Sequence, residues 1–438
     1  MTFERLGTMN VNAEGHLEIG GVDTLKLTEK YGTPLYVYDV ALIRDRARGF
    51  KKTFEELGVK AQVAYASKAF SAVAIYQLMA EEGLSLDVVS GGELYTAIKA
   101  NFPPERIHFH GNNKSAEEIH MALDYGIGCF VIDNYYEISL LEEILIERNE
   151  KEKASVLIRV TPGIEAHTHD YILTGQDDSK FGFGLTNGQA EKAIKQVLHA
   201  SASFDLIGLH CHIGSQIFET TGFKLAARRI MDKLVEWHQT LGFDSKVLNL
   251  GGGFGVRYTA EDEPLEPGEY VRQIMDEVRD VANSNDIDIP EIWIEPGRSL
   301  VGEAGTTLYK VGSRKEVPGI RNYIAVDGGM SDNIRPALYD AHYDAVLAAN
   351  PEKVAEETVA IAGKCCESGD MLIWDLPLPK SNAGEVLAVF CTGAYGYAMA
   401  SNYNRIPRPP VVFVENGVDK LIVARETYEN LVQNDLSL

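Results

Sequence analysis

The chain has 438 residues, longer than a usual single domain, which predicts one large domain joined to a smaller one. A hydrophobic content of 45% is typical of a globular protein. The 64 Asp and Glu residues exceed the 41 Lys and Arg residues and give a net charge of −23, which argues against nucleic acid or an anionic membrane as the main partner.

Targeting signals and cysteine spacing indicate where the protein works. The start, Met1–Leu6, has no basic region followed by an apolar stretch, so we expect no signal peptide. No apolar run approaches the roughly 18 residues that span a bilayer. The five cysteines are odd in number and lack a C-x-x-C spacing, which argues against a disulfide framework or a structural zinc site. We therefore expect a soluble, cytoplasmic protein.

From about residue 60, short apolar runs alternate with amphipathic stretches such as 138–145. Strand–helix alternation predicts a parallel sheet. Eight strands within roughly 250 residues favour an α/β fold of the (β/α)₈ TIM-barrel type, although a doubly wound sheet fits the same pattern. The expected strands are 62–66, 85–89, 107–110, 128–132, 155–160, 205–211, 246–250 and 291–295.

After about residue 305 the pattern changes to strand-like runs separated by turns, with little helical period. Such runs predict an antiparallel β-domain of the sandwich or barrel kind. They lie at 323–326, 359–362, 371–374, 385–391, 411–414 and 421–423, and two N-terminal runs, 16–19 and 35–38, are expected to add strands. We place the barrel at 41–305 and the β-domain at 1–40 and 306–438.

Polar residues follow the predicted barrel strands where each strand ends. They are Lys68, Asp87, His110, Asp133, Arg159, His212, the Gly251–Gly253 turn and Glu295. The carboxyl ends of barrel strands form the face that carries active sites, so these residues are expected to converge.

Lys68 and the glycine turn have a functional and an ordinary interpretation. A lysine at a strand mouth has its stem against apolar walls, and desolvation there favours the neutral amine that can form a Schiff base; the ordinary alternative is a solvated surface lysine. The Gly251–Gly253 turn follows the seventh strand, where barrels commonly bind phosphate, and glycines let backbone N–H groups approach an anion. The alternative is a plain tight turn.

The sequence His210-Cys211-His212 invites a metal interpretation, because histidines at i and i+2 of a strand point to one face. Zinc hydrolases of the barrel class carry His-x-His at their first strand with further His and Asp ligands, and no matching set is present here. We therefore expect no metal. An imidazole stacked on a flat cofactor, or a core histidine, fits better.

Together these motifs resemble the diaminopimelate decarboxylases, in the alanine-racemase-like class of pyridoxal-phosphate barrels, from Tyr36 to Tyr395. Motifs shared with ornithine and arginine decarboxylases are Tyr65–Ala69, His212–Gln216, Gly251–Gly255 and Glu295–Arg298. More specific to the diaminopimelate branch are His167–Asp170, Thr174–Gln176, Lys180–Gly182, Arg335–Tyr339 and Cys366–Asp370.

The resemblance implies pyridoxal 5'-phosphate as cofactor and gives each residue a role. Lys68 would carry the cofactor as a Schiff base, His212 would stack on its ring, Glu295 would face the ring nitrogen, and Asp87 and Arg159 would support them. The cofactor phosphate would be held by Ser215, Gly251, Gly252, Gly253, Tyr395 and the segment of Pro296, Gly297 and Arg298.

The resemblance also implies the substrate and the assembly. Arg298, Arg335, Tyr339, Glu367 and Tyr395 would bind the amino acid. Cys366 would reprotonate Cα, with Lys68 as the other possible donor, and Cys366 and Glu367 would reach the site across the interface of a homodimer. The implied reaction converts meso-2,6-diaminopimelate to L-lysine and CO₂, the last step of lysine biosynthesis.

Three alternatives remain open. Sibling decarboxylases act on ornithine, arginine or carboxynorspermidine. Those that act on basic side chains would need acidic residues to bind them at the position where this chain has Arg335. Alanine racemase lacks the Cys366–Asp370 segment. A barrel that carries pyridoxal phosphate without turnover would lack the β-domain.

Overall fold

The computed structural model describes residues 5–164 and 178–438. The chain divides into two compact units. The barrel unit comprises Arg46–Gly255 and Pro264–Gly297, and the β unit comprises Met1–Asp45, Val256–Glu263 and Arg298–Leu438. The division expected from the sequence, with the barrel at 41–305 and the β-domain at 1–40 and 306–438, remains a prediction.

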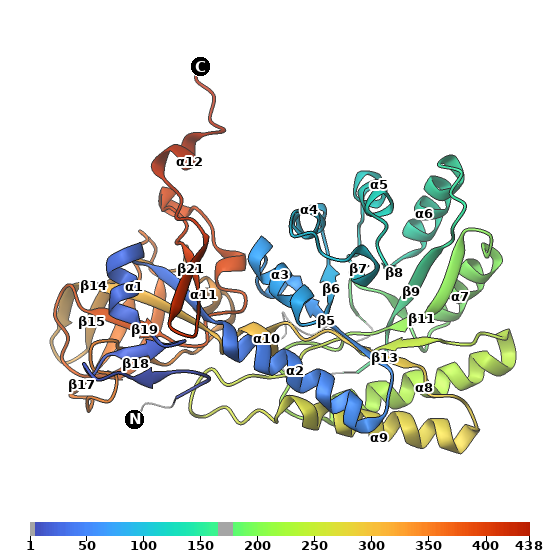
Figure 1. Ribbon diagram of the computed structural model, residues 1–438, viewed down its shortest axis with the longest axis horizontal. Helices are drawn as coiled ribbons and strands as arrows, with labels where there is room; N and C mark the ends of the chain where they lie inside the picture. The colour runs from blue at the N-terminus through green and yellow to red at the C-terminus, as the bar shows by residue number, and fades with distance from the viewer. Residues whose placement is uncertain (1–4, 165–177) are drawn as a thin grey trace. The chain divides into compact units, whose positions relative to one another are not determined.

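The barrel unit contains a closed ring of eight parallel strands, which confirms the predicted TIM barrel (Figure 1). Along the ring the order is β9, β11, β12, β13, β5, β6, β7 and β8, and pairing of β8 with β9 closes it. Each predicted strand overlaps an observed one: β5 (Ala61–Ala66), β6 (Ser85–Val88), β7 (Ile107–Phe109), β8 (Cys129–Ile132), β9 (Ala154–Thr161), β11 (Phe204–His210), β12 (Val247–Asn249) and β13 (Glu291–Ile294). The two-residue strand β10 (Phe183–Gly184) adds to β9.

Helices connect consecutive barrel strands, as parallel strands require. They are α3 (Val73–Glu81), α4 (Gly91–Lys99), α5 (Ala116–Tyr125), α6 (Tyr135–Glu147), α7 (Gln189–His199), α8 (Thr221–Leu241) and α9 (Pro267–Asn285). Helix α2 (Val40–Leu57) precedes β5.

Helix ends follow from local sequence. Ser115 begins α5 with a capping box, in which its hydroxyl accepts from the Glu118 N–H and the Glu118 carboxylate accepts from the Ser115 N–H. Gly126 ends the helix in the left-handed conformation, at φ 76°. Gly126 therefore ends the helix three residues before β8 begins at Cys129.

Buried side chains fill the barrel. Val131, Leu157, Val247 and Trp293 pack together as one core cluster from four strands. The His108 ring stacks on Trp293, with centroids 4.2 Å apart and planes 6° apart. Burial lowers the pKa of His108 to about 3, so this histidine is a neutral core residue.

The β unit contains a sheet in the order β18-β17-β15-β14-β4-β20-β21, with β16 and β19 attached through β14. Most pairings are antiparallel, but β4 pairs with β20, and β15 with β17, in parallel. The strands are β4 (Leu35–Asp39), β14 (Gly305–Val317), β15 (Arg321–Val326), β16 (Ala345–Leu347), β17 (Glu357–Ala362), β18 (Met371–Leu378), β19 (Val386–Val389), β20 (Val411–Glu415) and β21 (Val418–Val423).

Smaller elements complete the β unit. A three-stranded sheet of β1 (Asn10–Val11), β2 (Leu17–Ile19) and β3 (Val22–Asp23) precedes α1 (Thr24–Tyr31). The short helices are α10 (Arg298–Val301), α11 (Arg335–Tyr339) and α12 (Tyr428–Val432).

The sequence analysis missed β14, which at 13 residues is the strand that joins β15, β19 and β4. Its first half is buried, but its second half, from Gly312 on, is mostly polar and exposed. A strand that changes from buried to exposed along its length shows no single two-residue alternation, which explains the omission.

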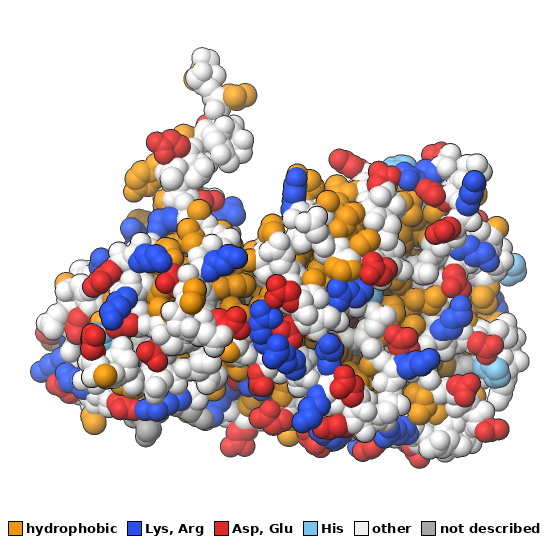
Figure 2. Space-filling view, viewed as in Figure 1, with side chains coloured by type: hydrophobic (Ala, Val, Ile, Leu, Met, Phe, Trp, Pro, Cys, Tyr) orange, Lys and Arg blue, Asp and Glu red, His pale blue; other side chains and the backbone are white. Residues whose placement is uncertain are grey.

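No helix among the described residues is both long and apolar enough to cross a membrane. Acidic and basic side chains are interspersed over the face of the molecule that Figure 2 shows.

Candidate active site

The strand-end residues predicted from the sequence gather at one face of the barrel unit. Asp87 in β6, Arg159 in β9 and Glu295 directly after β13 are buried, with 4, 8 and 6% of their surface exposed. Lys68 lies in the 3₁₀ turn η1 (Ser67–Ala69) that follows β5. Its charge acts on both Asp87 and His212, so the structure does bring these groups together.

One expectation about Lys68 was wrong. Its side chain is exposed, so the protein itself does not desolvate the amine as the strand-mouth argument predicted. The neighbouring Ser67 and Ala69 are buried, whereas Lys68 between them is exposed.

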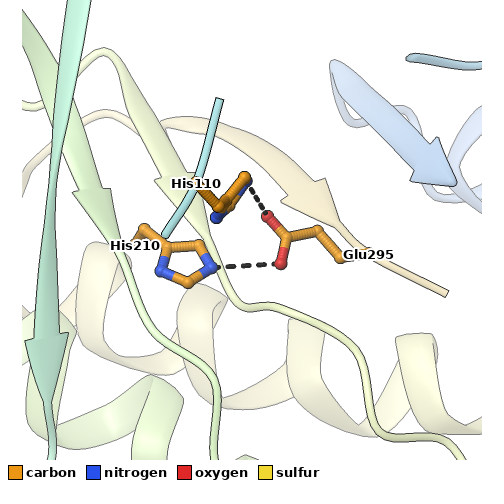
Figure 3. A group of neighbouring side chains, drawn as sticks. All are labelled: His110, His210 and Glu295. Carbon is orange, nitrogen blue, oxygen red and sulfur yellow. Dashed lines mark hydrogen bonds and ion pairs between the residues drawn. The ribbon is translucent and has the colours of Figure 1, made fainter. Parts of the chain in front are cut away.

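Three side chains from other strands surround the Glu295 carboxylate (Figure 3 shows two of them). Asn249 Nδ2 donates to Oε1 at 2.6 Å, and His110 Nε2 lies 3.1 Å from the same oxygen. His210 Nε2 lies 3.1 Å from Oε2. Burial raises the pKa of Glu295, but the two histidines lower it more, so the pKa is well below its usual value.

Asp87 is the second buried carboxyl at this face. Its Oδ1 lies 3.6 Å from His110 Nε2. Burial raises the pKa of Asp87 to about 6, against the opposing pull of His110. His110 thus lies between two carboxyl groups of different proton affinity.

His212 lies two residues beyond β11 and is held by the glycine turn. The Gly252 N–H donates to His212 Nδ1 at 3.2 Å, so the imidazole proton is on Nε2. Burial, with the charges of Lys68 and Arg159, lowers the pKa of His212 well below its usual value. A neutral ring in one tautomer is suited to stacking against a flat ligand.

The Gly251–Gly253 turn allows no side chains. A Cβ on Gly251 would lie 2.4 Å from the Cys211 carbonyl, one on Gly252 would lie 2.0 Å from the Glu295 carbonyl, and one on Gly253 would lie 2.3 Å from the Gly214 carbonyl. The Gly251 N–H donates to Asn249 Oδ1 at 2.9 Å, and Gly252 N–H to His212. Close packing against neighbouring carbonyl groups therefore requires glycine at these positions, and the N–H groups of Gly251 and Gly252 already have acceptors within the protein.

Other predicted cofactor residues flank this turn. Ser215 is half-buried in the loop after β11. The Pro296 carbonyl accepts from Ala66 N–H at 3.2 Å, and a Cβ on Gly297 would lie 3.1 Å from that of Ala66. The segment after β13 is thus held close to the end of β5, which precedes Lys68.

Arg159 is fixed by an aromatic ring and an acid. Its guanidinium lies 4.3 Å from the centre of the Phe181 ring and 3.7 Å from Asp133 Oδ2. Asp133 Oδ1 accepts from the Gly182 N–H at 2.9 Å. The Lys180–Gly182 motif therefore supports Arg159 from the side.

In the β unit, two buried arginines surround Tyr258. Arg298 and Arg335 are each 6% exposed. Arg298 donates to the Tyr258 hydroxyl, and its guanidinium lies 4.7 Å from the Tyr395 ring. The Arg335 guanidinium lies 4.8 Å from the Tyr258 ring and 5.8 Å from the Tyr339 ring, and donates to the Tyr343 hydroxyl at 3.0 Å.

Among the described residues, no carboxylate lies within ion-pair distance of Arg335, and its Nε has no hydrogen-bond partner. A guanidinium cannot lose its proton in a protein. A buried charge without an opposite charge is costly, so Arg335 provides a site for an anionic group of a ligand.

The Cys366–Asp370 segment forms a turn that is exposed except for the buried Asp370. Cys366 is exposed, and its N–H donates to Asn404 Oδ1 at 2.7 Å. Glu367 is also exposed, with Tyr403 Oη 3.5 Å from its Oε2. The other four cysteines are buried, and all five are free thiols.

The structure changes the metal interpretation of the histidines. His210 groups with His110 and Glu295, not with His212, in a set whose ligand atoms lie within 4.8 Å of one another. Glu14, His16 and Asp23 form another such set among the described residues, where the Asp23 side chain accepts from the first turn of α1. The His210 Nε2 hydrogen bond to Glu295 Oε2 and the 3.1 Å ion-pair contact of His110 Nε2 with Oε1 account for the buried set.

Some predicted motifs lie outside the described residues, namely His167–Asp170 and Thr174–Gln176. Sequence analysis also missed Tyr258 and Asn249. Asn249 is the last residue of β12, two residues before Gly251, and a polar residue at a strand end is the signal that identified the others. Tyr258 lies in a loop and carries no such signal.

Comparisons with known proteins identify the family of this chain. The pattern of the family described as pyridoxal-dependent decarboxylase, pyridoxal binding domain, matches residues 40–302. A diaminopimelate decarboxylase from Bacillus methanolicus is 68% identical over 96% of this chain and 96% of its own length. One from Bacillus subtilis is 67% identical over 98% of this chain and 97% of its own length.

Solved structures agree as well. A crystal structure of diaminopimelate decarboxylase from M. jannaschii in co-complex with L-lysine has a TM-score of 0.90 and 38% identity, with 98% of each chain covered. A lysine/ornithine decarboxylase from Vibrio vulnificus, at 22% identity and a TM-score of 0.74, shares the fold. The chain belongs to the pyridoxal-dependent decarboxylases, in the diaminopimelate decarboxylase family.

Proposed function

We propose that this protein decarboxylates meso-2,6-diaminopimelate to L-lysine and CO₂ with pyridoxal 5'-phosphate as cofactor. The observation that carries the choice of substrate is the buried Arg335, which has no carboxylate partner among the described residues. A substrate with a second amino-acid end brings the missing carboxylate.

The residues of the barrel face fit the cofactor. Glu295 is an ionised carboxylate at a strand end, suited to the proton of a pyridinium ring. Asp87 Oδ1 and Asp133 Oδ2 are buried without hydrogen-bond partners in the described part of the chain. Glycines at 251 to 253 pack closely against neighbouring carbonyl groups, and a side chain at any of them would displace the turn that is proposed to bind the phosphate.

Each residue then has a task in binding. Lys68 holds the cofactor through its amine, and the neutral His212 ring packs against the cofactor's flat face. Ser215, the Gly251–Gly253 turn, the Pro296–Arg298 segment and Tyr395 bind the phosphate. Asp87 and Arg159 keep the groups around Lys68 and His212 in place.

Decarboxylation leaves an electron pair on Cα, and the bound cofactor supplies the electron sink that accepts it. Glu295 keeps a proton at the ring nitrogen because its carboxylate is ionised and held in place. A proton must then replace CO₂ at Cα. Cys366 is the donor, with Lys68 as the alternative.

Substrate selectivity follows from charge. Arg298 and Arg335 bind the distal carboxylate, with Tyr339, Glu367 and Tyr395 around the distal end. Ornithine and lysine lack that carboxylate and would leave the Arg335 charge buried and unpaired, a loss of about 3 kcal/mol or more. Sibling decarboxylation of ornithine, arginine or carboxynorspermidine is therefore not favoured.

The protein acts as a cytoplasmic homodimer with shared active sites, and it needs neither nucleic acid nor membrane. Exposure of Cys366 and Glu367 in the single chain supports the dimer, since both would meet substrate only in the partner subunit's site. A net charge of −23 opposes binding to nucleic acid.

The test is CO₂ release by the purified protein with added pyridoxal phosphate, on meso-diaminopimelate, ornithine and arginine in parallel. We expect release from diaminopimelate alone, with lysine as the product. Release only from ornithine or arginine would keep the cofactor and overturn the role of Arg335. A yellow protein that releases no CO₂ from any of the three would contradict the proposed activity.

A further inference from the structure

Two buried histidines at the barrel face, His110 and His210, have no role in the proposed function. His110 follows β7, His210 ends β11 and Glu295 follows β13, so three separate strands bring these side chains to one point (Figure 3). His110 and His210 are 4 and 1% exposed. The two imidazole rings meet edge to face, with centroids 4.9 Å apart.

Both histidines direct Nε2 at the same carboxylate, one to each oxygen. The separations are 3.1 Å from His110 to Oε1 and 3.1 Å from His210 to Oε2. A carboxylate has no proton to donate when ionised, so His210 Nε2, which forms a hydrogen bond with Oε2, carries the hydrogen. This hydrogen bond fixes the tautomer of His210, and His110 Nε2 lies at ion-pair distance from the other oxygen.

Hydrogen-bond capacity distinguishes the two oxygens. Oε1 accepts from Asn249 Nδ2 at 2.6 Å and also lies next to His110. Among the described residues, Oε2 has only His210 as a partner. An ionised carboxylate oxygen accepts two hydrogen bonds, so Oε2 keeps one acceptor position for a ligand N–H.

Loss of either histidine would change the state of Glu295. A buried carboxylate that loses a donor either takes up a proton or turns toward another partner. The nearest competing acid is Asp87, whose Oδ1 lies 3.6 Å from the same His110 Nε2. Two histidines face Glu295 but only His110 faces Asp87, so this arrangement favours the ionised state at Glu295.

We propose that His110 and His210 are positioning residues that hold Glu295 in one ionised orientation and thereby keep the ring nitrogen of bound pyridoxal phosphate protonated. The inference rests on the proposed role of Glu295 at that nitrogen. It gives the two histidines an effect on the cofactor without contact with the reacting atoms.

The experiment measures the protonation of the ring nitrogen directly. The holoenzyme is loaded with pyridoxal phosphate carrying ¹⁵N in the ring, and the ¹⁵N resonance is compared among wild type, His210→Leu, His210→Gln and Glu295→Gln. Leucine removes the donor at similar volume, whereas the glutamine amide restores an N–H at the position of Nε2. The same pair of variants is made at His110.

We expect His210→Leu to move the resonance toward the unprotonated value and to lower kcat about 10- to 100-fold. A loss of this size is typical when residues that hydrogen-bond to metal ligands are mutated. His210→Gln should restore most of the resonance position and most of kcat. With 1-deazapyridoxal phosphate, which has no ring nitrogen, wild type and His210→Leu should have the same residual rate. A purely structural role would lower that rate as well.

The controls separate the possible failures. If Glu295→Gln moves the resonance and neither leucine variant does, the inference is wrong and the role of Glu295 stands. If Glu295→Gln leaves it unchanged, the proposed role of Glu295 fails together with the inference. A stoichiometric metal ion in the purified protein that is lost in His210→Leu would also overturn the inference, because the histidines would then be ligands.

Discussion

The barrel unit and the β unit hold their charged side chains in different ways. At the barrel face, Glu295 and Arg159 are buried, and each has opposing groups within the same unit, namely His110 and His210 for the acid and Asp133 for the arginine. In the β unit, Arg335 is equally buried but has only aromatic rings and hydroxyl groups around it.

The charges of the barrel face are therefore neutralised before any ligand binds, whereas the charge of Arg335 has no opposite partner in the described part of the chain until a ligand supplies one. A charge neutralised inside its own unit keeps its geometry with or without a ligand. A buried charge without an opposite partner gains most when an anion arrives. We therefore expect the barrel face to bind the cofactor independently of substrate, and the arginine cluster to decide which substrate reacts.

The largest expected effect is at the barrel face. Lys68→Ala should abolish the cofactor's visible absorbance and lower activity on the order of 10³-fold or more, because the amine that holds the cofactor is gone. Absorbance and CO₂ release are measured on the same sample, with Lys60→Ala, between α2 and β5, as the matched control. Full turnover by Lys68→Ala would contradict the proposal that the reaction takes place at the barrel face.

Much of the barrel face could be predicted from the sequence. Parallel strands in a closed barrel all end at one face, so a polar residue after each apolar run suffices to place Asp87, Arg159 and Glu295 near one another. The burial of individual groups could not be predicted this way. Lys68 is exposed although it directly follows an apolar strand, and its charge still acts on Asp87 and His212.

The β unit was harder to predict. The Arg335–Tyr339 and Cys366–Asp370 segments were identified only by family resemblance, since neither lies at the end of a periodic element. Tyr258 lies in no recognisable local sequence pattern. It is 40 residues from Arg298, the arginine that donates to its hydroxyl. Contacts between loops that are distant in sequence depend on the whole fold.

The second prediction tests the arginine cluster. Arg335→Leu should lower kcat/KM for diaminopimelate about 100- to 1000-fold, equivalent to about 3 to 4 kcal/mol, because the distal carboxylate loses its buried partner. Cofactor absorbance should not change. Arg321→Leu removes an arginine of the same unit that pairs at the surface with Asp375 and should have no effect. An unchanged KM and kcat for Arg335→Leu would disprove the comparison between the two units.

The third prediction concerns proton return to Cα. Cys366→Ala should keep the cofactor bound and slow turnover about 10- to 100-fold, since general acid catalysis by one group contributes at about this scale when Lys68 can replace it in part. Cys366→Ser, which keeps an acidic hydrogen, should lose less. Equal rates for wild type and Cys366→Ala would leave Lys68 as the donor.

The same variant tests the shared site. When Lys68→Ala and Cys366→Ala proteins are mixed and allowed to exchange subunits, roughly half of the dimers are mixed, and each mixed dimer has one intact site of two. Roughly a quarter of wild-type activity should therefore return. No recovery, in a mixture shown by mass to exchange, would place Lys68 and Cys366 of one site in the same chain.

The smallest expected effect on activity comes from Asp332, a buried acid of the β unit that precedes Arg335. Its Oδ1 accepts from the Gly329 N–H at 2.9 Å, and Tyr309 donates to its Oδ2. Burial raises the pKa of Asp332 from 3.8 to about 7. The folded protein therefore retains a proton that the unfolded chain releases, so this contribution to stability is complete below about pH 4 and is lost as the pH rises to about 7.

The loss through Asp332 amounts to about 4 kcal/mol at most. Asp332→Asn should flatten the decline of the unfolding free energy between about pH 4 and pH 7, because an amide does not titrate while the Tyr309 hydroxyl can turn to accept from it. Urea unfolding across this range measures the slope. Asp340→Asn is the matched control, since Asp340 is exposed and its left-handed backbone suits asparagine equally. Parallel slopes in wild type and Asp332→Asn would mean that Asp332 is ionised throughout, and that the β unit tolerates a second uncompensated charge close to Arg335 in sequence.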